Sequence, residues 1–204
     1  EDLVGAVSGA VLNFEYDDVG RVTEATSAAS WTVGVDAFGF TVTTTKTTDA
    51  YRVIMGQPRV RRSDFVTEAE SLDGSHATTA GFVEFDHHTE AGTPIGQIRE
   101  ARGESRTTAV DAFGFTTTRT FTRDVYDQGL INRWGIARVD YSESWTIAES
   151  ADGSRAITGG EGLIGRWDAR SAGFKDLTLE DLVGAVSGAV LNFEYDDVGR
   201  VTEA

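Results

Sequence analysis

The sequence contains no cysteine, only two prolines and only two lysines among its 18 basic residues. Without cysteine, disulfides, thiolate catalysis and cysteine-ligated metal sites are excluded. The longest apolar run, residues 182–193, is too short for a membrane span and is interrupted by glycine and serine, so no membrane insertion is expected. The net charge of −15 predicts a chain that stays soluble and avoids nucleic acid.

One segment occurs twice without a single difference. Residues 1–25 and residues 180–204 both read EDLVGAVSGAVLNFEYDDVGRVTEA, so the first copy begins at Glu1 and the second at Glu180. A match of this length predicts a tandem array of nearly identical periods, of which this chain holds slightly more than one. We therefore expect both ends of the chain to be interior points of such an array.

The second copy contains the best helical pattern of the sequence, over residues 179–193. Thr178 is the expected N-cap, and Leu179, Leu182, Val183, Val186, Val190 and Phe193 form one apolar stripe. Gly184, Ala185, Gly188 and Ala189 form a ridge of small residues beside it, which predicts tight packing on a sheet. Residues 3–14 are expected to form the same helix.

The remaining chain alternates between strand patterns and turn signals. Asp17-Asp18-Val19-Gly20, Asp36-Ala37-Phe38-Gly39 and Asp73-Gly74 predict tight turns between antiparallel strands. Trp31, Val33 and Val35 predict a strand with one apolar face. Thr41, Thr43, Thr45 and Thr47 are expected on one strand face, and Thr116, Thr118, Thr120 and Thr122 repeat that row.

A second, diverged repeat lies within each period. Val35-Asp36-Ala37-Phe38-Gly39-Phe40-Thr41 returns with the same letters from Val110, and Ala69-Glu70-Ser71 returns from Ala148. The predicted fold is mainly β, a wound antiparallel hairpin meander of tube, shell or solenoid form with one short helix per period. Its predicted parts are residues 1–25 (end of the preceding repeat), 26–94 (first β-module), 95–173 (second β-module) and 174–204 (helical insert and hairpin).

The hairpin Tyr16-Asp17-Asp18-Val19-Gly20-Arg21-Val22-Thr23 resembles the YD repeat of RHS-type proteins and teneurins, and it recurs at Tyr195 to Thr202. That resemblance implies a wound β-hairpin sheet and an extracellular or cell-surface location. Only the duplicated segment carries the pattern, and the C-terminal autoproteolytic motif of RHS-type proteins is absent from the sequence. A toxin cargo or a cleavage activity is therefore not implied.

Few residues suggest chemistry. His87 and His88 are adjacent, so on a strand they point to opposite faces, and we expect both to be solvated loop residues. Calcium held by Asp17 and Asp18 with Glu15 is an alternative, but the pattern is typical of a turn. No cofactor and no enzymatic activity are predicted.

The sequence favours a structural repeat unit of a long extracellular fibre, tube or surface stalk, joined head-to-tail to identical units in one covalent array or as a homopolymer. The predicted joint residues are the apolar members of the duplicated segment: Leu182, Val186, Val190, Phe193, Tyr195, Leu3, Val7, Val11, Phe14 and Tyr16.

Two alternatives stay open. One is a repetitive adhesin that binds polysaccharide or ice through a threonine face, and the other is an RHS-type protective shell. The candidate ligand-binding residues of the first alternative are Thr41, Thr43, Thr45, Thr116, Thr118 and Thr120.

Overall fold

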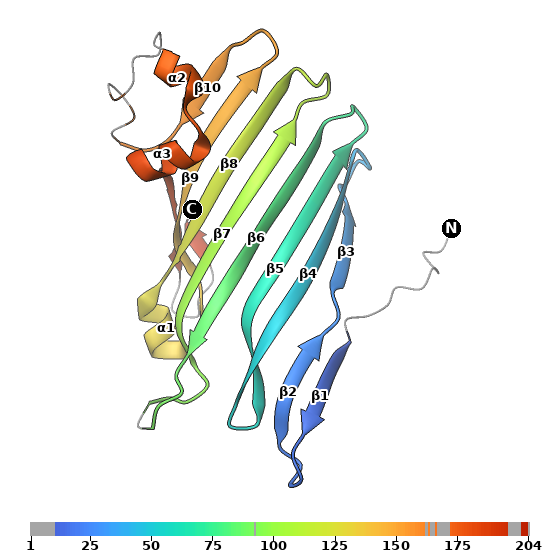
Figure 1. The fold of residues 1–204 in the computed structure, drawn as a ribbon, viewed down its shortest axis with the longest axis vertical. Coiled ribbons are helices and arrows are strands. Elements are labelled where there is room, and N and C mark those ends of the chain that lie inside the picture. The colour runs from blue at the N-terminus through green and yellow to red at the C-terminus, as the bar shows by residue number, and fades with distance from the viewer. Residues whose placement is uncertain are drawn as a thin grey trace.

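The computed structural model describes residues 11–91, 93–161, 163, 166, 172–195 and 201–203. Most of them form one open antiparallel sheet in which neighbouring strands follow each other in the chain (Figure 1). The predicted mainly-β hairpin meander is therefore confirmed. None of the helices in these residues is long and apolar enough to cross a membrane.

The long strands β4 to β9 form the centre of the sheet, and shorter strands lie at its edges (Figure 1). The strands are β1 (Leu12–Tyr16), β2 (Val22–Ser27), β3 (Ser30–Val35), β4 (Thr41–Ile54), β5 (Gln57–Ser71), β6 (His76–His87), β7 (Ile98–Val110), β8 (Thr116–Tyr126), β9 (Val139–Ser150), β10 (Arg155–Thr158), β11 (Ala189–Asn192), β12 (Glu194–Tyr195) and β13 (Val201–Glu203). The helices are α1 (Gln128–Trp134), α2 (Ala172–Asp176) and α3 (Leu179–Ala185).

At each edge of the sheet, two short strands together occupy one strand position. β2 and β3 both pair with the free side of β4, through Thr26 opposite Ala50 and Ser30 opposite Thr47. At the other edge, β10 and β11 both pair with the free side of β9. The segment with α2 and α3 connects β10 to β11, so it interrupts a single strand position instead of adding one.

The two β-modules inside the period have matching turns. The carboxylate of Asp36 accepts hydrogen bonds from the N–H groups of Phe38, Phe40 and Thr41. Asp111 accepts the same three bonds from the equivalent residues of the second module. Each carboxylate therefore satisfies the backbone donors of a tight turn, and the predicted Asp36 turn is confirmed.

The predicted helix is much shorter in the structure. Thr178 caps α3 as expected, and it forms a capping box with Asp181. The helix stops before Val186, which is extended (φ −138°, ψ 157°), and residues 189–192 form strand β11. The prediction is wrong for residues 186–193, because residues 189–192 form backbone hydrogen bonds with β9 in place of those of a helix.

The helix prediction is also wrong at the other copy, where β1 begins at Leu12. Residues 3–10 of that predicted helix lie outside the described residues. The ridge of small residues does not act as one surface. A side chain at Gly184 would meet nothing, whereas a Cβ added at Gly188 would lie 2.7 Å from the Ser144 nitrogen of β9. Close approach therefore explains Gly188 alone.

Helix α1 was not predicted. Asp127 caps its first turn by accepting from the Leu130 nitrogen, and Gly135 ends it in the left-handed region at φ 65°. The sequence pattern there favours a turn between β8 and β9. The short helix serves as that turn, and its own residue Ile131 is buried.

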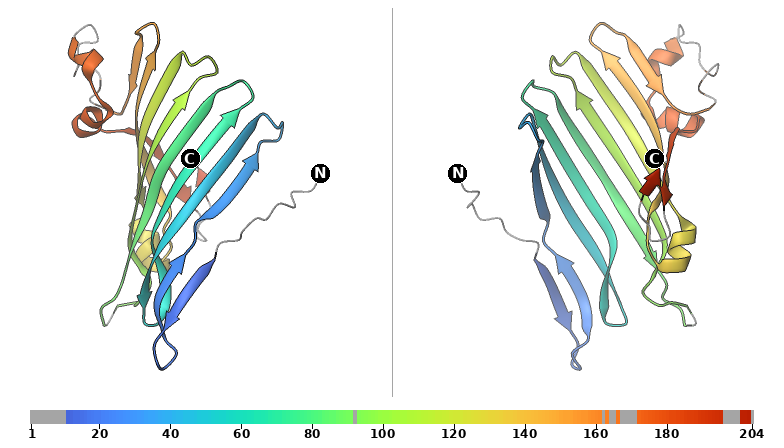
Figure 2. Two further views of the ribbon diagram at one scale, coloured as in Figure 1. Left: turned by 45° about the vertical axis from the view of Figure 1, so that its right-hand side comes forward. Right: turned by 180° about the vertical axis from the view of Figure 1, so that it is seen from behind.

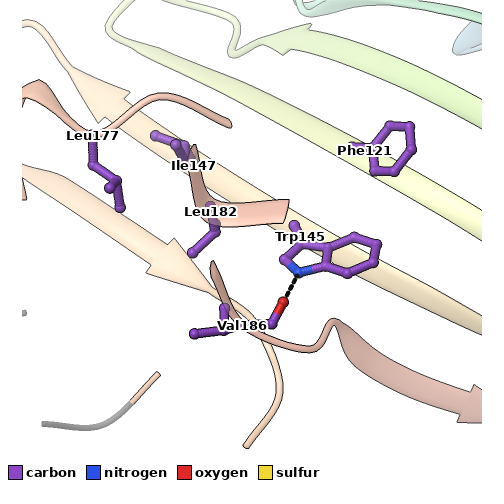
Figure 3. Packing of buried hydrophobic residues seen from close by; sticks show 6 residues of the cluster. All are labelled: Phe121, Trp145, Ile147, Leu177, Leu182 and Val186. Atoms are coloured by element: carbon purple, nitrogen blue, oxygen red, sulfur yellow. Dashed lines mark hydrogen bonds between the residues drawn. The ribbon is translucent and has the colours of Figure 1, made fainter. Parts of the chain in front are cut away.

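The main apolar core lies between the α2–α3 insert and strands β8 and β9 (Figure 3). Trp145 lies at its centre, 2% exposed, and its indole nitrogen donates to the Val186 carbonyl at 2.8 Å. Arg155 of β10 donates to the carbonyls of Phe174, Lys175 and Leu177 and so holds the end of α2. The buried members of the core are Phe121, Trp145, Ile147, Leu177, Leu182 and Val186.

Candidate functional site: the repeat joint and the threonine face

Both copies of the duplicated segment form the same hairpin. In the first copy, Glu15 lies opposite Glu24 and Tyr16 opposite Val22, with a bulge between Glu15 and Tyr16. In the second copy, Glu194 lies opposite Glu203 and Tyr195 opposite Val201, with the bulge at the same place. The paired residues occupy equivalent positions of the two copies. The two copies therefore agree in strand register as well as in sequence.

The turn of the first hairpin is built by one carboxylate. Asp17 accepts from the Val19 and Arg21 nitrogens and forms an ion pair with the Arg21 side chain at 2.8 Å. These bonds hold the pKa of Asp17 below its usual range. Because the turn and Arg21 engage both oxygens, the geometry accounts for Asp17 without calcium.

The two hairpins differ in what lies beside them. The Tyr195 hydroxyl donates to the Val139 carbonyl of β9 at 2.5 Å, and its burial there raises the pKa of this phenol. Its counterpart Tyr16 is 60% exposed, because no strand described here lies on the outer side of β1. The strand edge that lies against β9 in the second copy is therefore open in the first copy.

The predicted joint residues occupy three environments. Leu182 and Val186 are buried in the insert core. Phe193 and Tyr195 are half-buried beside β9, and Phe14 and Tyr16 are exposed on β1. Val190 and its counterpart Val11 are 52% and 51% exposed. The remaining predicted residues, Leu3 and Val7, lie outside the described residues.

Threonines form an unbroken row across the sheet. Each lies opposite the next in the strand register, with one in every strand position from the β3 edge to the β10 edge. Residues opposite each other in adjacent strands point to the same face, and we call this side of the sheet the threonine face. The row consists of Thr32, Thr45, Thr67, Thr79, Thr107, Thr120, Thr146 and Thr158.

The two rows on either side of this row, on the same face, are also uncharged. Phe65 is their one large member, and its ring lies over Gly81, where an added Cβ would be 2.7 Å from the ring. One row is Gly34, Thr43, Ala69, Ala77, Ala109, Thr118, Ala148 and Ala156, and the other is Ser30, Thr47, Phe65, Gly81, Ser105, Thr122, Ser144 and Ala189.

Hydroxyl groups of the threonine face bond to each other. The pairs Thr45–Thr67, Thr79–Thr107 and Thr120–Thr146 each have oxygens 2.9 Å apart. Thr41 pairs with Ser71 at 3.0 Å, and Thr116 pairs with Ser150 at 3.1 Å. The structure thus brings all six candidate ligand-binding threonines to one face, in three matched rows.

On the opposite side, charged residues lie directly behind the three central rows, and we call this side the charged face. Its rows alternate with those of the threonine face and include Lys46, Glu68, Glu104 and Arg119. The insert with α2 and α3 packs on this charged face, over Phe121, Trp145 and Ile147. Figure 2 shows the two helices on one side of the sheet.

The sequence reasoning missed six members of the threonine row: Thr32, Thr67, Thr79, Thr107, Thr146 and Thr158. The signal that finds them is the distance of each threonine from its turn. Thr67 and Thr79, for example, lie at equal distances from the turn at Asp73, so they must face each other in the hairpin.

His87 is buried, at 7% exposure, so the expectation of a solvated residue is wrong for it. Burial, with a contribution from Arg59, lowers the pKa of His87. Within the described residues, no group of three or more metal-ligating side chains comes together.

The sequence matches no model of a known protein family, and neither characterised proteins nor solved structures are similar to this chain.

Proposed function

We propose that this chain is the repeating unit of a long extracellular or cell-surface fibre, in which a meandering antiparallel sheet continues from one identical unit to the next in a covalent array. The observation that carries the proposal is the pair of identical, identically bulged hairpins, one at the β1 edge of the sheet and one that directly follows β11 at the opposite edge. Each hairpin supplies one half of a joint.

The two halves fit together strand by strand. Residues 189–192 pair with β9, and they correspond to residues 10–13 of the first copy. In the first copy Leu12 and Asn13 pair with β2, and Thr26 of β2 pairs with Ala50 of β4. In an array built by overlaying the copies, β9 of one unit, the shared strand, and β2 and β4 of the next unit would lie in one sheet.

In the proposed array, the strand register would continue from one unit to the next without an offset. Leu191 lies opposite Ser142, and its counterpart Leu12 lies opposite Ser27, whose hydroxyl donates to the carbonyl of Asp49. Inside the unit, the residues opposite one another lead from Asp49 back to Ser142. In the proposed array, the row of one unit would thus meet the same row in the next unit, and the threonine row would run along the whole array.

This geometry predicts the dimensions of the fibre. Each period supplies eight strand positions, which at about 4.8 Å each span about 38 Å of the sheet. The right-handed strand twist would coil such a ribbon about its axis. The net charge of −15 on each chain would keep the charged faces of neighbouring fibres apart.

The test is to image chains that contain two, three and four consecutive periods by electron microscopy. We expect rods that lengthen by one constant step per period, no longer than about 38 Å. Strings of separate globules, or particles that do not lengthen, would contradict the proposal. In the three-period chain, Val190→Pro in each period removes a backbone donor from the joint strand and should convert the rod into linked globules.

Ala91→Pro is the matched control for the joint variant. Ala91 follows Glu90 in the turn closed by the Thr93-to-Glu90 hydrogen bond, a place where proline suits the backbone. The control rods should keep their length.

A further inference from the structure

We infer that the threonine face is an interaction surface whose partner is the threonine face of a second copy of this chain, so that two sheets stack face to face. The inference is independent of the joint proposed above, because it concerns the broad side of the sheet and not its edges. It applies to a single chain of 204 residues.

Charge distribution identifies which face can meet a copy of itself. The chain carries a net charge of −15, yet the three central rows of the threonine face contain no charged residue. Stacking two charged faces would bring carboxylates such as Glu68 and Glu104 close to like charges, and close like charges oppose association. The three central rows of the threonine face avoid that repulsion.

The internal hydroxyl pairs favour a protein partner over a sugar or ice. Six of the eight threonines in the central row already bond to a neighbour in the row, at 2.9 Å. A polar ligand would have to compete with those bonds, whereas a dry interface needs them, because buried hydroxyls without partners are costly. The central rows also contain no tryptophan or tyrosine on which a sugar ring could stack.

The size of the face suits a stable pair. Eight strand positions at about 4.8 Å each give a width of about 38 Å, and three rows at about 6.8 Å each give a height of about 20 Å. The resulting area of roughly 780 Å² is close to the roughly 800 Å² that each partner buries in a standard interface. Small side chains also let the two backbones approach closely over most of this area.

Of the described helices, α2 and α3 cover the charged face and not the threonine face. They bury Phe121, Trp145 and Ile147 (Figure 3), which lie in rows that alternate with the threonine row and therefore face the other side of the sheet. Two-layer packing is the usual way for a sheet to exclude water from one face. Two stacked copies would give a ribbon with both charged faces and both inserts outward.

The experiment measures self-association by sedimentation equilibrium. The unchanged chain should form dimers, and the double variant Thr79→Lys with Thr107→Lys should raise the dimer dissociation constant at least about a hundred-fold, because two unpaired ammonium groups would be buried. The control is Thr78→Lys with Thr108→Lys. These two residues form the adjacent cross-strand pair on the charged face, so dimerisation should change less than about three-fold there.

A second measurement covers the case in which the lysine variant does not fold. Because the chain has no cysteine, A109C and T108C each give one labelling site, on the threonine face and the charged face respectively. A spin label on A109C should lose mobility as the concentration rises, whereas a label on T108C should not. A chain that stays monomeric, equal effects at both sites, or a monomer that adsorbs to polysaccharide or ice through Thr79 would each overturn the inference.

Discussion

The first β-module, β3 to β6, and the second, β7 to β10, share their turns and their register, but they bury very different side chains. Trp145 in β9 is 2% exposed, whereas Val66, which holds the same position in β5, is 40% exposed. Phe121 likewise corresponds to Lys46, and Ile147 to Glu68. The α2–α3 insert covers only the second module. The two modules therefore share one backbone arrangement, but their charged face is covered in the second module and open in the first.

The difference teaches what each part of the sequence specifies. Turn carboxylates and threonine rows are the same in both modules, so they specify the sheet itself. The apolar residues of the charged face follow the insert, so they specify where a second layer attaches. Four pairs of variants would test this separation, in order of decreasing expected effect.

Trp145→Ala should cost about 4 kcal/mol of unfolding free energy, because it leaves a cavity at the centre of the core. It also removes the donor that bonds the Val186 carbonyl. The matched change Val66→Ala should cost less than about 1 kcal/mol, since that side chain is already partly in water. Chemical denaturation of both variants measures the two values, and equal losses would show that the insert does not protect the second module.

Arg155→Ala should cost about 2 kcal/mol, because charged hydrogen bonds of Arg155 hold the end of α2. His76 has the corresponding place at the start of β6 and is exposed, so His76→Ala should change stability by less than about 0.5 kcal/mol. Hydrogen exchange of α2 and α3 is the direct measurement. If R155A leaves exchange in the insert unchanged, the contacts from Arg155 do not fasten it.

These contrasts also show how much the sequence could predict. Alternation and turn residues such as Asp36 and Gly39 predicted the meander, because they act over a few residues. Residues 186–193 have a helical sequence pattern, but residues 189–192 pair with β9, which is far away in the chain. This long-range pairing outweighed the local pattern. The full threonine row depended in the same way on register across every strand, so only its members on β4 and β8 were predicted.

Thr45→Val and Thr120→Val should have equal effects, in contrast to the two predictions above. Each change breaks one hydroxyl pair of the threonine face, with Thr67 and Thr146 respectively, and should cost about 1 kcal/mol. Thermal unfolding of the two variants makes the comparison. A much larger loss at Thr120 would mean that the insert influences the threonine face through the sheet.

The smallest effect is expected at the ion pair between Glu180 of the insert and Arg106 of β7, whose atoms Oε1 and Nη1 are 2.5 Å apart. Both side chains are more than 60% exposed, so Glu180→Gln should change stability by less than about 0.5 kcal/mol. Its hydrogen bond with Arg106 holds the pKa of Glu180 below the usual 4.5. Since the folded chain binds this proton less readily than the unfolded chain, the contribution is complete above about pH 4.5 and is lost as the pH falls through the folded pKa.

Denaturation curves of the unchanged chain and E180Q at neutral pH and near pH 3 measure this contribution. The small difference between them should shrink on acidification and also in high salt, which screens exposed pairs. A difference that persists in acid would place the role of Glu180 in the first turn of α3 and not in the bond to Arg106. The first module has no insert to provide such a partner, so Thr78→Ala, on the corresponding open part of the charged face, should show no pH dependence of its own.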